Sequence, residues 1–335
     1  RLCYIGQRAM GALEFEPTTG TATTIDQSVN IAALTKLANE VLTQREVLVG
    51  QLGEKHDAHA LQDILRVGTS AGGARAKALL AWNPSTGEFR SGQLKVGSGF
   101  EHWLLKFDGI GNNSDKELSD PQGYGRIEYA YHLMAMDAGI EMTRCRLHHE
   151  GGRSHFMTKR FERTETGKKL HMQSLAALCH YDYDDPASYS YEQAMMTIRQ
   201  ISSQLAKDCQ QQFARAVFNV VARNQDDHVK NIAFLMNSTG QWVLSPAFDV
   251  VYAWNPNGAY TGAHQMSING KRDNFVLEDL LALASSAGIK AAKAKQVIER
   301  VIASVKRWPQ FAEQAGVEPV RSKQIANAHR VLIKN

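Results

Sequence analysis

The chain has 335 residues, of which 43% are hydrophobic and 21% charged, and its net charge is +4. This composition excludes global disorder and predicts a large hydrophobic core divided over two lobes or domains. The weak positive charge suits either an anionic ligand, with occasional nucleic-acid contact, or an ordinary solvated surface.

The four cysteines lie far apart and include no C-x-x-C pair, which argues against a zinc site. They are Cys3, Cys145, Cys179 and Cys209. Such scattered residues predict buried thiols in a reducing compartment, and hence a cytoplasmic protein. No apolar run reaches the ~18 residues of a membrane span, so no membrane contact is expected. Because the chain opens on Arg1 and its first residues already resemble structured protein, we expect a further N-terminal piece before it.

The N-terminal quarter predicts a mixture of strands and helices. Apolar residues around Gly6 and Gly11 predict a hairpin over 1–16. Apolar residues at 3-and-4 spacing predict a helix over 26–46, with Asp26 as its N-cap. A second helix is expected over 56–66. It is followed by residues 67–77, a stretch rich in glycine and other residues with small side chains.

Short apolar runs then predict an antiparallel sheet, with strands over 79–84, 103–107 and 155–161. Residues 108–125 read as a polar loop. A helix is predicted over 126–138, because its apolar residues share one face and Gly139 follows.

The second half is mainly helical. Amphipathic patterns predict helices over 194–205 and 213–221, and again within 277–333. Between them, 232–245 predicts a hairpin. Strands that precede helices, rather than alternating with them, predict an α+β fold with two lobes, 1–160 and 161–335.

Polar residues cluster just after the helix predicted over 213–221, in the sequence RNQDDHVKN. The cluster contains Asp226, Asp227, His228, Lys230 and Asn231. An exposed turn, where Asp and Asn are common, explains it as well as a catalytic loop does. We interpret His228 as a residue that orients this segment, and the other histidines as surface or structural residues, since none has metal-ligand spacing.

A second acid, Asp249, favours the catalytic interpretation. The predicted hairpin would fold its segment, SPAFDVV, back toward the loop that holds Asp226 and Asn231. Kinases use such a set: one carboxylate accepts or orients the proton of the attacking hydroxyl, while an amide oxygen and a second carboxylate hold magnesium. The spacing D-x-x-x-x-N alone arises readily by chance.

The strand-rich half offers groups for binding phosphates. Lys106 ends an apolar strand and is either an edge residue facing solvent or a phosphate ligand, with Glu128 as a possible partner. The glycine-rich stretch could wrap phosphates with backbone N–H groups, to which Arg75 or Lys77 would add charge.

Two other nucleotide motifs are excluded. Ala74 stands where a Walker A loop requires lysine. The glycines at 97–99 lack the third glycine of a dinucleotide-binding loop.

These motifs resemble the HipA family, the serine/threonine kinase toxins of bacterial persistence modules. The resemblance covers about residues 1–310 and is most specific in DDHVKN, LSPAFDVV, TSAGGARAK, WLLKF and HMQSLAALCH. It implies a two-lobed, protein-kinase-like fold that uses ATP and Mg²⁺. Asp227 and Ala76 depart from the residues common in the family, but neither change removes a group that the chemistry needs.

The resemblance also implies roles for individual residues. Asp226 corresponds to the catalytic aspartate, and Asn231 and Asp249 to the magnesium ligands. Lys106 would contact the ATP phosphates with Glu128 as its partner. The remaining implied positions are the phosphate-side loop Ala71, Gly72, Gly73, Ala74, Arg75, Ala76 and Lys77, the adenine-side residues Lys159, Arg160 and Phe161, and the autophosphorylated Ser70, which has Thr69 beside it.

The partners that the resemblance implies are a small helix-turn-helix antitoxin like HipB and, through it, operator DNA. By analogy the protein substrate would be an aminoacyl-tRNA synthetase. Two alternatives stay open: an antitoxin-binding co-repressor with weak or lost kinase activity, and a phosphotransferase that acts on a small molecule.

Overall fold

The computed structural model describes residues 3, 6, 9, 11–17, 28–43, 75–93, 96–109, 122–185 and 187–333. The chain forms two compact units. The first comprises Arg1–Arg126 and Arg144–His171, and the second Ile127–Thr143 and Met172–Asn335. The simpler division into 1–160 and 161–335 stays a prediction.

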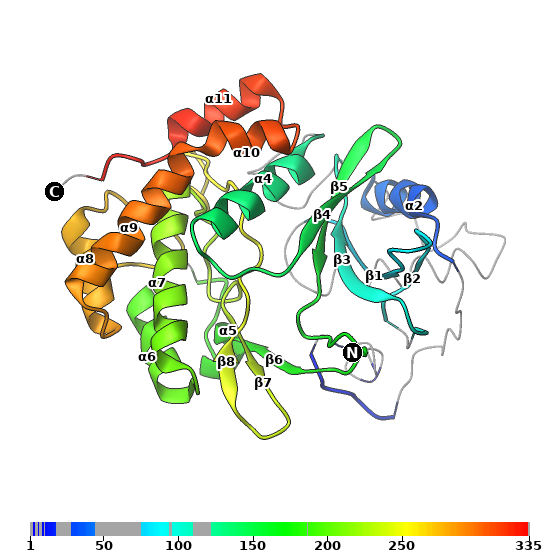
Figure 1. Cartoon of the computed structure of the whole chain (residues 1–335), viewed down its shortest axis with the longest axis horizontal. Helices are drawn as coiled ribbons and strands as arrows, with labels where there is room; N and C mark the ends of the chain where they lie inside the picture. Colours follow the sequence, from blue (N-terminus) through cyan, green and yellow to red (C-terminus); the bar gives the residue numbers. More distant parts are fainter. Residues whose placement is uncertain are drawn as a thin grey trace. The chain divides into compact units, whose positions relative to one another are not determined.

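Within the described residues, the first unit carries a five-stranded antiparallel sheet in the order β2-β1-β3-β5-β4 (Figure 1). The strands are β1 (Lys77–Trp82), β2 (Phe89–Ser91), β3 (Glu101–Lys106), β4 (Cys145–Glu150) and β5 (Arg153–Lys159). The three strands predicted from apolar runs are confirmed as β1, β3 and β5. The edge strands were missed, because β4 (CRLHHE) is mostly polar and β2 has three residues.

One face of this sheet is apolar, because side chains alternate along each strand. Leu80 pairs with Trp103 across β1 and β3, and Leu105 pairs with Met157 across β3 and β5. All four are fully buried, in a cluster with residues of helix α2 (Ile31–Thr43). The hydrophobic effect of covering this face therefore holds the helix on the sheet.

The N-terminal predictions need correction. Helix α2 begins later than predicted, and Asn30 rather than Asp26 caps it: the Ala33 N–H donates to Asn30 Oδ1 at 3.0 Å. None of the described residues within 1–16 lies in a strand, and Gly11 begins a turn there. Asp26 and the helix predicted over 56–66 lie outside the described residues.

A buried carboxylate fixes the start of helix α4 (Tyr124–Asp137) in the first unit. Asp108 accepts hydrogen bonds from the backbone N–H groups of Gly123 at 2.9 Å, Gly125 at 3.3 Å and Ser154 at 3.2 Å. A side chain on Gly125 would collide with the Ser154 carbonyl, so glycine is needed for this close approach. The rest of α4 confirms the predicted helix, and Gly139 follows it with φ +81°.

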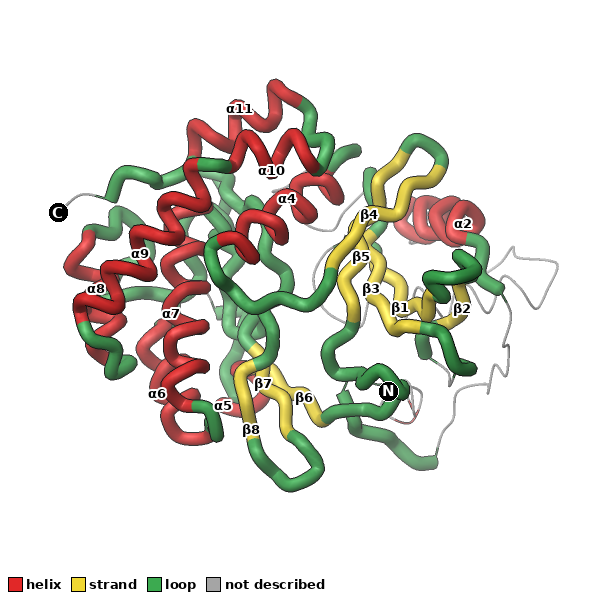
Figure 2. The backbone as a smooth tube through the Cα atoms, in the orientation of Figure 1, coloured by secondary structure: helices red, strands yellow, loops and turns green. Residues whose placement is uncertain are grey.

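The second unit is mainly helical, with a three-stranded sheet, β6-β7-β8, among its described residues (Figure 2). The elements are β6 (His171–Ser174), α5 (Leu175–Cys179), α6 (Tyr191–Ile201), α7 (Leu205–Ala222), β7 (Ala233–Met236), β8 (Trp242–Leu244), α8 (Leu277–Ser286), α9 (Ala291–Lys306), α10 (Trp308–Gln314) and α11 (Pro319–Ala328). The helix predicted over 194–205 is wrong at its end, because α6 stops at Ile201 and Leu205 already begins α7, which contains the helix predicted over 213–221. The helices predicted within 277–333 and the β7–β8 hairpin are confirmed.

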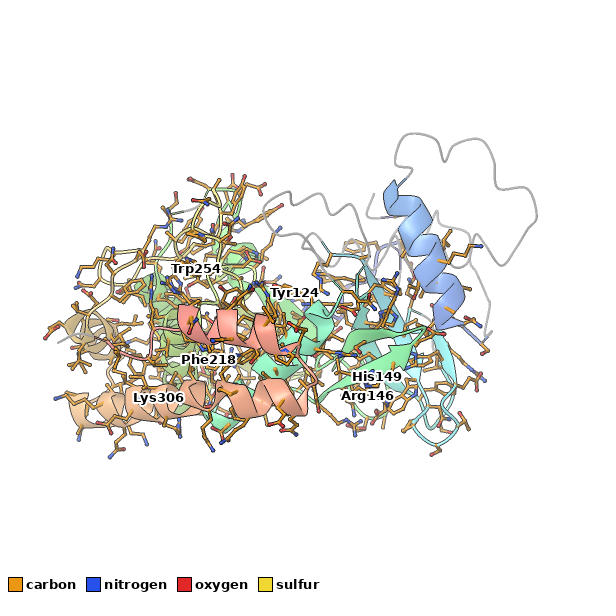
Figure 3. All side chains as sticks on the ribbon, turned by 90° about the horizontal axis from the view of Figure 1, so that it is seen from above. Tyr124, Arg146, His149, Phe218, Trp254 and Lys306 are labelled. Atoms are coloured by element: carbon orange, nitrogen blue, oxygen red, sulfur yellow. The ribbon has the colours of Figure 1, made fainter. Side chains whose placement is uncertain are left out.

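Helix α7 forms the centre of this unit and packs against α6, α8 and α9. Its Phe218, labelled in Figure 3, is fully buried. The ring of Phe218 meets that of Tyr131 edge-on, with 6.1 Å between the ring centroids. No helix in the described part of the chain combines the length and the apolar character needed to cross a bilayer. All four cysteines lie in described residues, and no disulfide joins them; Cys145 and Cys209 are the buried ones.

The packing around Gly125 predicts the effect of one methyl group. Gly125→Ala should lower the free energy of unfolding by about 1–3 kcal/mol, because the new Cβ must push Ser154 away from Asp108. Gly97→Ala is the control, since a Cβ there would have no neighbour within 4 Å. Thermal unfolding of the two variants measures the difference, and equal melting temperatures would contradict this account.

Candidate active site

Two loops of the second unit lie side by side, one after α7 and one after β8 (Figure 2). At one end, Gln225 N–H donates to Ala253 O at 3.0 Å and Ala253 N–H donates to Arg223 O at 3.1 Å. At the other end, Ser245 N–H donates to Ala233 O at 2.9 Å. The hairpin thus folds the second loop back onto the first, as the sequence predicted.

Arg223 reinforces the junction between these loops. It ends α7 in the left-handed conformation, with φ 59°. Its guanidinium lies 4.3 Å from the ring centroid of Trp254, and its Nε donates to Ala328 O at 2.9 Å (Figure 3). A cation–π contact of this kind helps to fix the direction in which the chain leaves the helix.

Asn231 and Asp249 line the same small cavity, with a volume of about 30 Å³. Asp249 has φ 55°, a left-handed conformation that non-glycine residues rarely adopt and that is concentrated at active sites. Asn231 Nδ2 donates to Asp226 O at 2.8 Å, so the amide oxygen is the atom that Asn231 can offer a cation. The Asp226 side chain is half exposed, at 49%.

These donors fit magnesium. A carboxylate and an amide oxygen are hard ligands, and Mg²⁺ commonly takes one or two carboxylates from the protein and completes its shell with water and phosphate oxygens. Among the described residues, no group of three or more His, Cys, Asp or Glu side chains is close enough to hold a metal by itself. Asn231 and Asp249 could supply two oxygen ligands of such a shell.

His228 lies beside the catalytic candidate. Its Nε2 is 3.6 Å from Asp226 Oδ1, and its buried Nδ1 has no partner among the described residues. Tyr183 covers this part of the loop: its ring meets His228 edge-on at 6.3 Å, and Lys230 Nζ lies 2.7 Å from its centroid. The proposed role of His228 in orienting the loop stays a prediction.

Asp227 holds the loop through buried hydrogen bonds, a role that its place in the polar cluster did not reveal. Its side chain is 1% exposed, whereas that of Asp226 is 49% exposed. Oδ2 lies 2.7 Å from both Tyr191 Oη and His264 Nδ1, and Oδ1 accepts from the Gln265 N–H at 2.8 Å. The DD pair was a usable signal, because neighbouring residues of an extended loop point in opposite directions.

The electrostatics of Asp227 follow from these contacts. Burial acts to raise the pKa of the carboxyl group, but His264 and the other hydrogen-bond donors outweigh it and lower the pKa below its usual range. The negative charge of Asp227 and burial raise the pKa of Tyr191, which remains a neutral donor. The loop is therefore held by a buried, charged and fully bonded group.

Lys106 lies in the first unit, on the sheet face opposite to α2. It is 6% exposed and sits in β3, between β1 and β5, so the alternative of a solvent-facing edge residue is wrong. Lys77 is its direct cross-strand neighbour, and Lys106 Nζ is 5.9 Å from the centroid of Phe156 on the other side. The two lysines concentrate positive charge on this face of the sheet, as the predicted role of Lys106 toward phosphates requires.

The other predicted binding residues are less closely grouped. Arg75 donates to Phe107 O at 3.2 Å and lies over the ring of Tyr124 at 4.5 Å. Glu128, in α4, is 1% exposed and belongs to the second unit, so its pairing with Lys106 stays a prediction. Thr69, Ser70, Ala71, Gly72, Gly73 and Ala74 lie outside the described residues.

The predicted adenine-side residues end β5 and follow it. Lys159 Nζ pairs with Glu101 at 3.1 Å and Glu165 at 2.7 Å. Arg160 forms a buried ion pair with Glu162, where both side chains are 2% exposed. Because these two cations have carboxylate partners, any contact with adenine here would fall to the backbone or to Phe161.

Residues 69–308 match the model of the HipA-like C-terminal domain. The chain belongs to this family. A search of curated protein sequences found no match.

Solved structures support the same fold. The HipA chain of the Shewanella oneidensis MR-1 complex of HipA, HipB and operator DNA is 16% identical to this chain, with a TM-score of 0.64. The match covers 97% of this chain and 75% of that one. The Helicobacter pylori proinflammatory kinase CtkA is 12% identical over 68% of this chain and 92% of its own, but its TM-score of 0.41 is too low to define a fold relationship. The predicted α+β, HipA-like fold is therefore confirmed.

The burial of Asp227 predicts that substitutions of Asp226 and Asp227 affect the stability of the fold unequally. Asp227→Ala should lower the free energy of unfolding by about 3–5 kcal/mol, because it leaves His264 and Tyr191 without their buried partner. Asp226→Ala should change it by less than about 0.5 kcal/mol, since that side chain is half exposed. Denaturant unfolding measures both, and a similar loss in the two variants would contradict the anchoring role.

Proposed function

We propose that this HipA-like chain is an ATP- and magnesium-dependent serine/threonine protein kinase that acts as the toxin of a toxin–antitoxin module. The observation that carries the proposal is the placement of Asn231 and Asp249 on one cavity, on loops that are hydrogen-bonded to each other. Membership of the HipA-like family supports the same activity.

Asp226 is the proposed catalytic residue. It accepts or orients the proton of a serine or threonine hydroxyl, while Asn231 fixes its backbone through the bond to Asp226 O. His228 steadies the same loop. Asn231 and Asp249 hold Mg²⁺, which supplies positive charge against the phosphate oxygens when it is bound.

Residues of the first unit bind the nucleotide in this proposal. Lys106 contacts the phosphates, with Lys77 beside it and Glu128 as its partner. The stretch 71–77 offers backbone N–H groups to the phosphates. The adenine lies against 159–161.

The proposed partners follow from the family. The relative from Shewanella oneidensis was solved with HipB and operator DNA. We propose that this chain binds a similar small helix-turn-helix antitoxin, and reaches operator DNA through it, in the cytoplasm. An aminoacyl-tRNA synthetase is the proposed protein substrate.

The kinase proposal predicts that replacing one carboxylate with an amide greatly slows phosphate transfer. Asp226→Asn should lower the rate of phosphate transfer from ATP to protein by about 10²–10⁴. Asp184→Asn is the control, because it removes the same charge from an exposed position. Transfer of labelled γ-phosphate, to this chain or to candidate substrates, measures the effect.

The outcomes separate the alternatives. Full activity in Asp226→Asn would overturn the assigned role. Binding of antitoxin without phosphate transfer by the unsubstituted chain would favour a co-repressor. ATP turnover that requires a metabolite and leaves no phosphoprotein would favour a small-molecule phosphotransferase.

Autophosphorylation of Ser70 is the proposed means of switching the enzyme off. Its phosphate would carry about −1.5 to −2 charges at pH 7 beside the phosphate-binding stretch. Ser70→Asp should therefore bind ATP more weakly than Ser70→Ala in calorimetric titrations. Equal affinities would count against this regulation.

A further inference from the structure

Helices α6, α7, α8 and α9 pack together in the second unit (Figure 1). A cavity of about 430 Å³ lies where α6 and α8 end and where α7 and α9 begin. This volume is within the range of cavities that bind small molecules. No described residue lines both this cavity and the one that Asn231 and Asp249 line, so a ligand here would be additional to the metal of the candidate active site.

The charged groups of this cavity have one sign. Among the described residues, Arg199, Lys290 and Lys293 line it and no carboxylate does. All three cations are exposed, and none forms an ion pair within the part of the chain that the structure describes. Asp208 lies in the same part of α7, but it is buried and accepts from the Leu244 N–H at 2.7 Å instead. The cavity therefore favours an anionic ligand.

Arg199 is held against the turn between α8 and α9. Its Nη1 donates to Ser286 O at 3.4 Å, and a Cβ at Gly288 would lie 3.3 Å from the same nitrogen. Gly288 has φ +73°, a conformation that favours glycine, and its lack of a side chain leaves room for the guanidinium. The bond to Ser286 uses one of five N–H donors, so the guanidinium keeps others for a ligand.

The two lysines follow at the start of α9, close to this guanidinium. Lys290 comes two residues after Gly288 and is the N-cap of the helix. Lys293 lies three residues further on, a spacing that brings side chains onto the same side of a helix. The long lysine side chains can therefore reach the same part of the cavity as Arg199.

Positive charge is unfavourable at this end of α9. The start of a helix carries a partial positive charge, which favours acidic residues and opposes basic ones. The first turn of α9 contains no acidic residue, and no side chain caps it. Two lysines here act against the stability of the helix, and an anion bound beside them would offset that effect.

Most of the remaining lining is apolar. The residues are Leu205, Ala206, Cys209, Ala287 and Ile289. Sites for small molecules usually combine such an apolar lining with a few charged groups that fix the orientation of the ligand. The ligand therefore has an apolar part as well as an anionic one.

We propose that this cavity binds a small molecule in which a phosphate group is joined to an apolar body. The phosphate binds Arg199, Lys290 and Lys293 at the start of α9, and the apolar body lies against Leu205 and Ile289. A phosphate monoester suits three cations better than a carboxylate does, because it carries about −1.5 to −2 charges at pH 7. This site does not depend on the proposed kinase activity.

Binding of phenyl phosphate without Mg²⁺, followed by ligand-observed NMR, tests the site. The combined variant Lys290→Gln, Lys293→Gln should raise the dissociation constant at least about tenfold, because two charged donors are lost. Lys295→Gln is the control, since it removes the same charge from an exposed residue of α9 outside the cavity lining. Phenol, which lacks the phosphate, should bind more weakly to the unsubstituted chain.

Equal dissociation constants in the combined variant and the control, or no saturable binding by the unsubstituted chain, would overturn the proposal. Crystals soaked in phenyl phosphate locate the site. Density is expected between the starts of α7 and α9, and density confined to other parts of the chain would also overturn the proposal. Asp249→Asn should bind phenyl phosphate as the unsubstituted chain does, so the result is independent of the magnesium site.

Thermal unfolding tests the charge at the start of α9. Without a ligand, the combined variant should melt about 1–4 °C above the unsubstituted chain, because two cations leave the positive end of the helix. Phenyl phosphate should raise the melting temperature of the unsubstituted chain and not that of the combined variant. A combined variant that melts lower without ligand would mean that the lysines themselves stabilise the fold, and would overturn the proposed site.

Discussion

The buried carboxylate of Asp227 is the constraint on which the arrangement of the candidate site depends. It gathers donors from the start of α6 and from the 264–265 segment onto the loop between α7 and β7. The side chain of Asp227 is buried, whereas that of its neighbour Asp226 is half exposed. A buried charge is stable here because both oxygens are bonded and His264 faces it.

Buried carboxylates hold irregular backbone at two other places in the chain. Asp108 collects three backbone N–H groups at the start of α4, and Asp208 binds the backbone before the second loop. Irregular backbone cannot satisfy its own hydrogen bonds, so buried carboxylates replace the bonds that a helix or sheet would supply. Loops held in this way keep fixed positions without regular structure, as a metal or phosphate site requires.

Sequence patterns predicted the elements whose apolar residues repeat regularly. The stripe of α7 and the runs in β1 and β3 are of this kind, because their burial follows from simple periodicity. Strand β4 was missed because it is mostly polar and its formation depends on pairing with β5. The cap at Asn30 was missed because Asp26 is a competing N-cap residue nearby in the sequence. Asn231 and Asp249 could be predicted to lie together because the hairpin returns one loop to the other, and the structure places both on one cavity. The catalytic role of Asp226 stays a prediction. The role of Asp227 depends on His264 and Tyr191, whose proximity no local pattern reveals.

The central claim is that Asn231 and Asp249 form a magnesium and nucleotide site. Calorimetric titration of ATP, with and without Mg²⁺, into the unsubstituted chain and into Asp249→Asn tests it most directly. Asparagine tolerates the left-handed backbone at this position, so the substitution removes charge with little change of conformation. The account predicts binding that needs both Mg²⁺ and Asp249. Equal binding by the two proteins, or none by the unphosphorylated, unsubstituted chain, would contradict it.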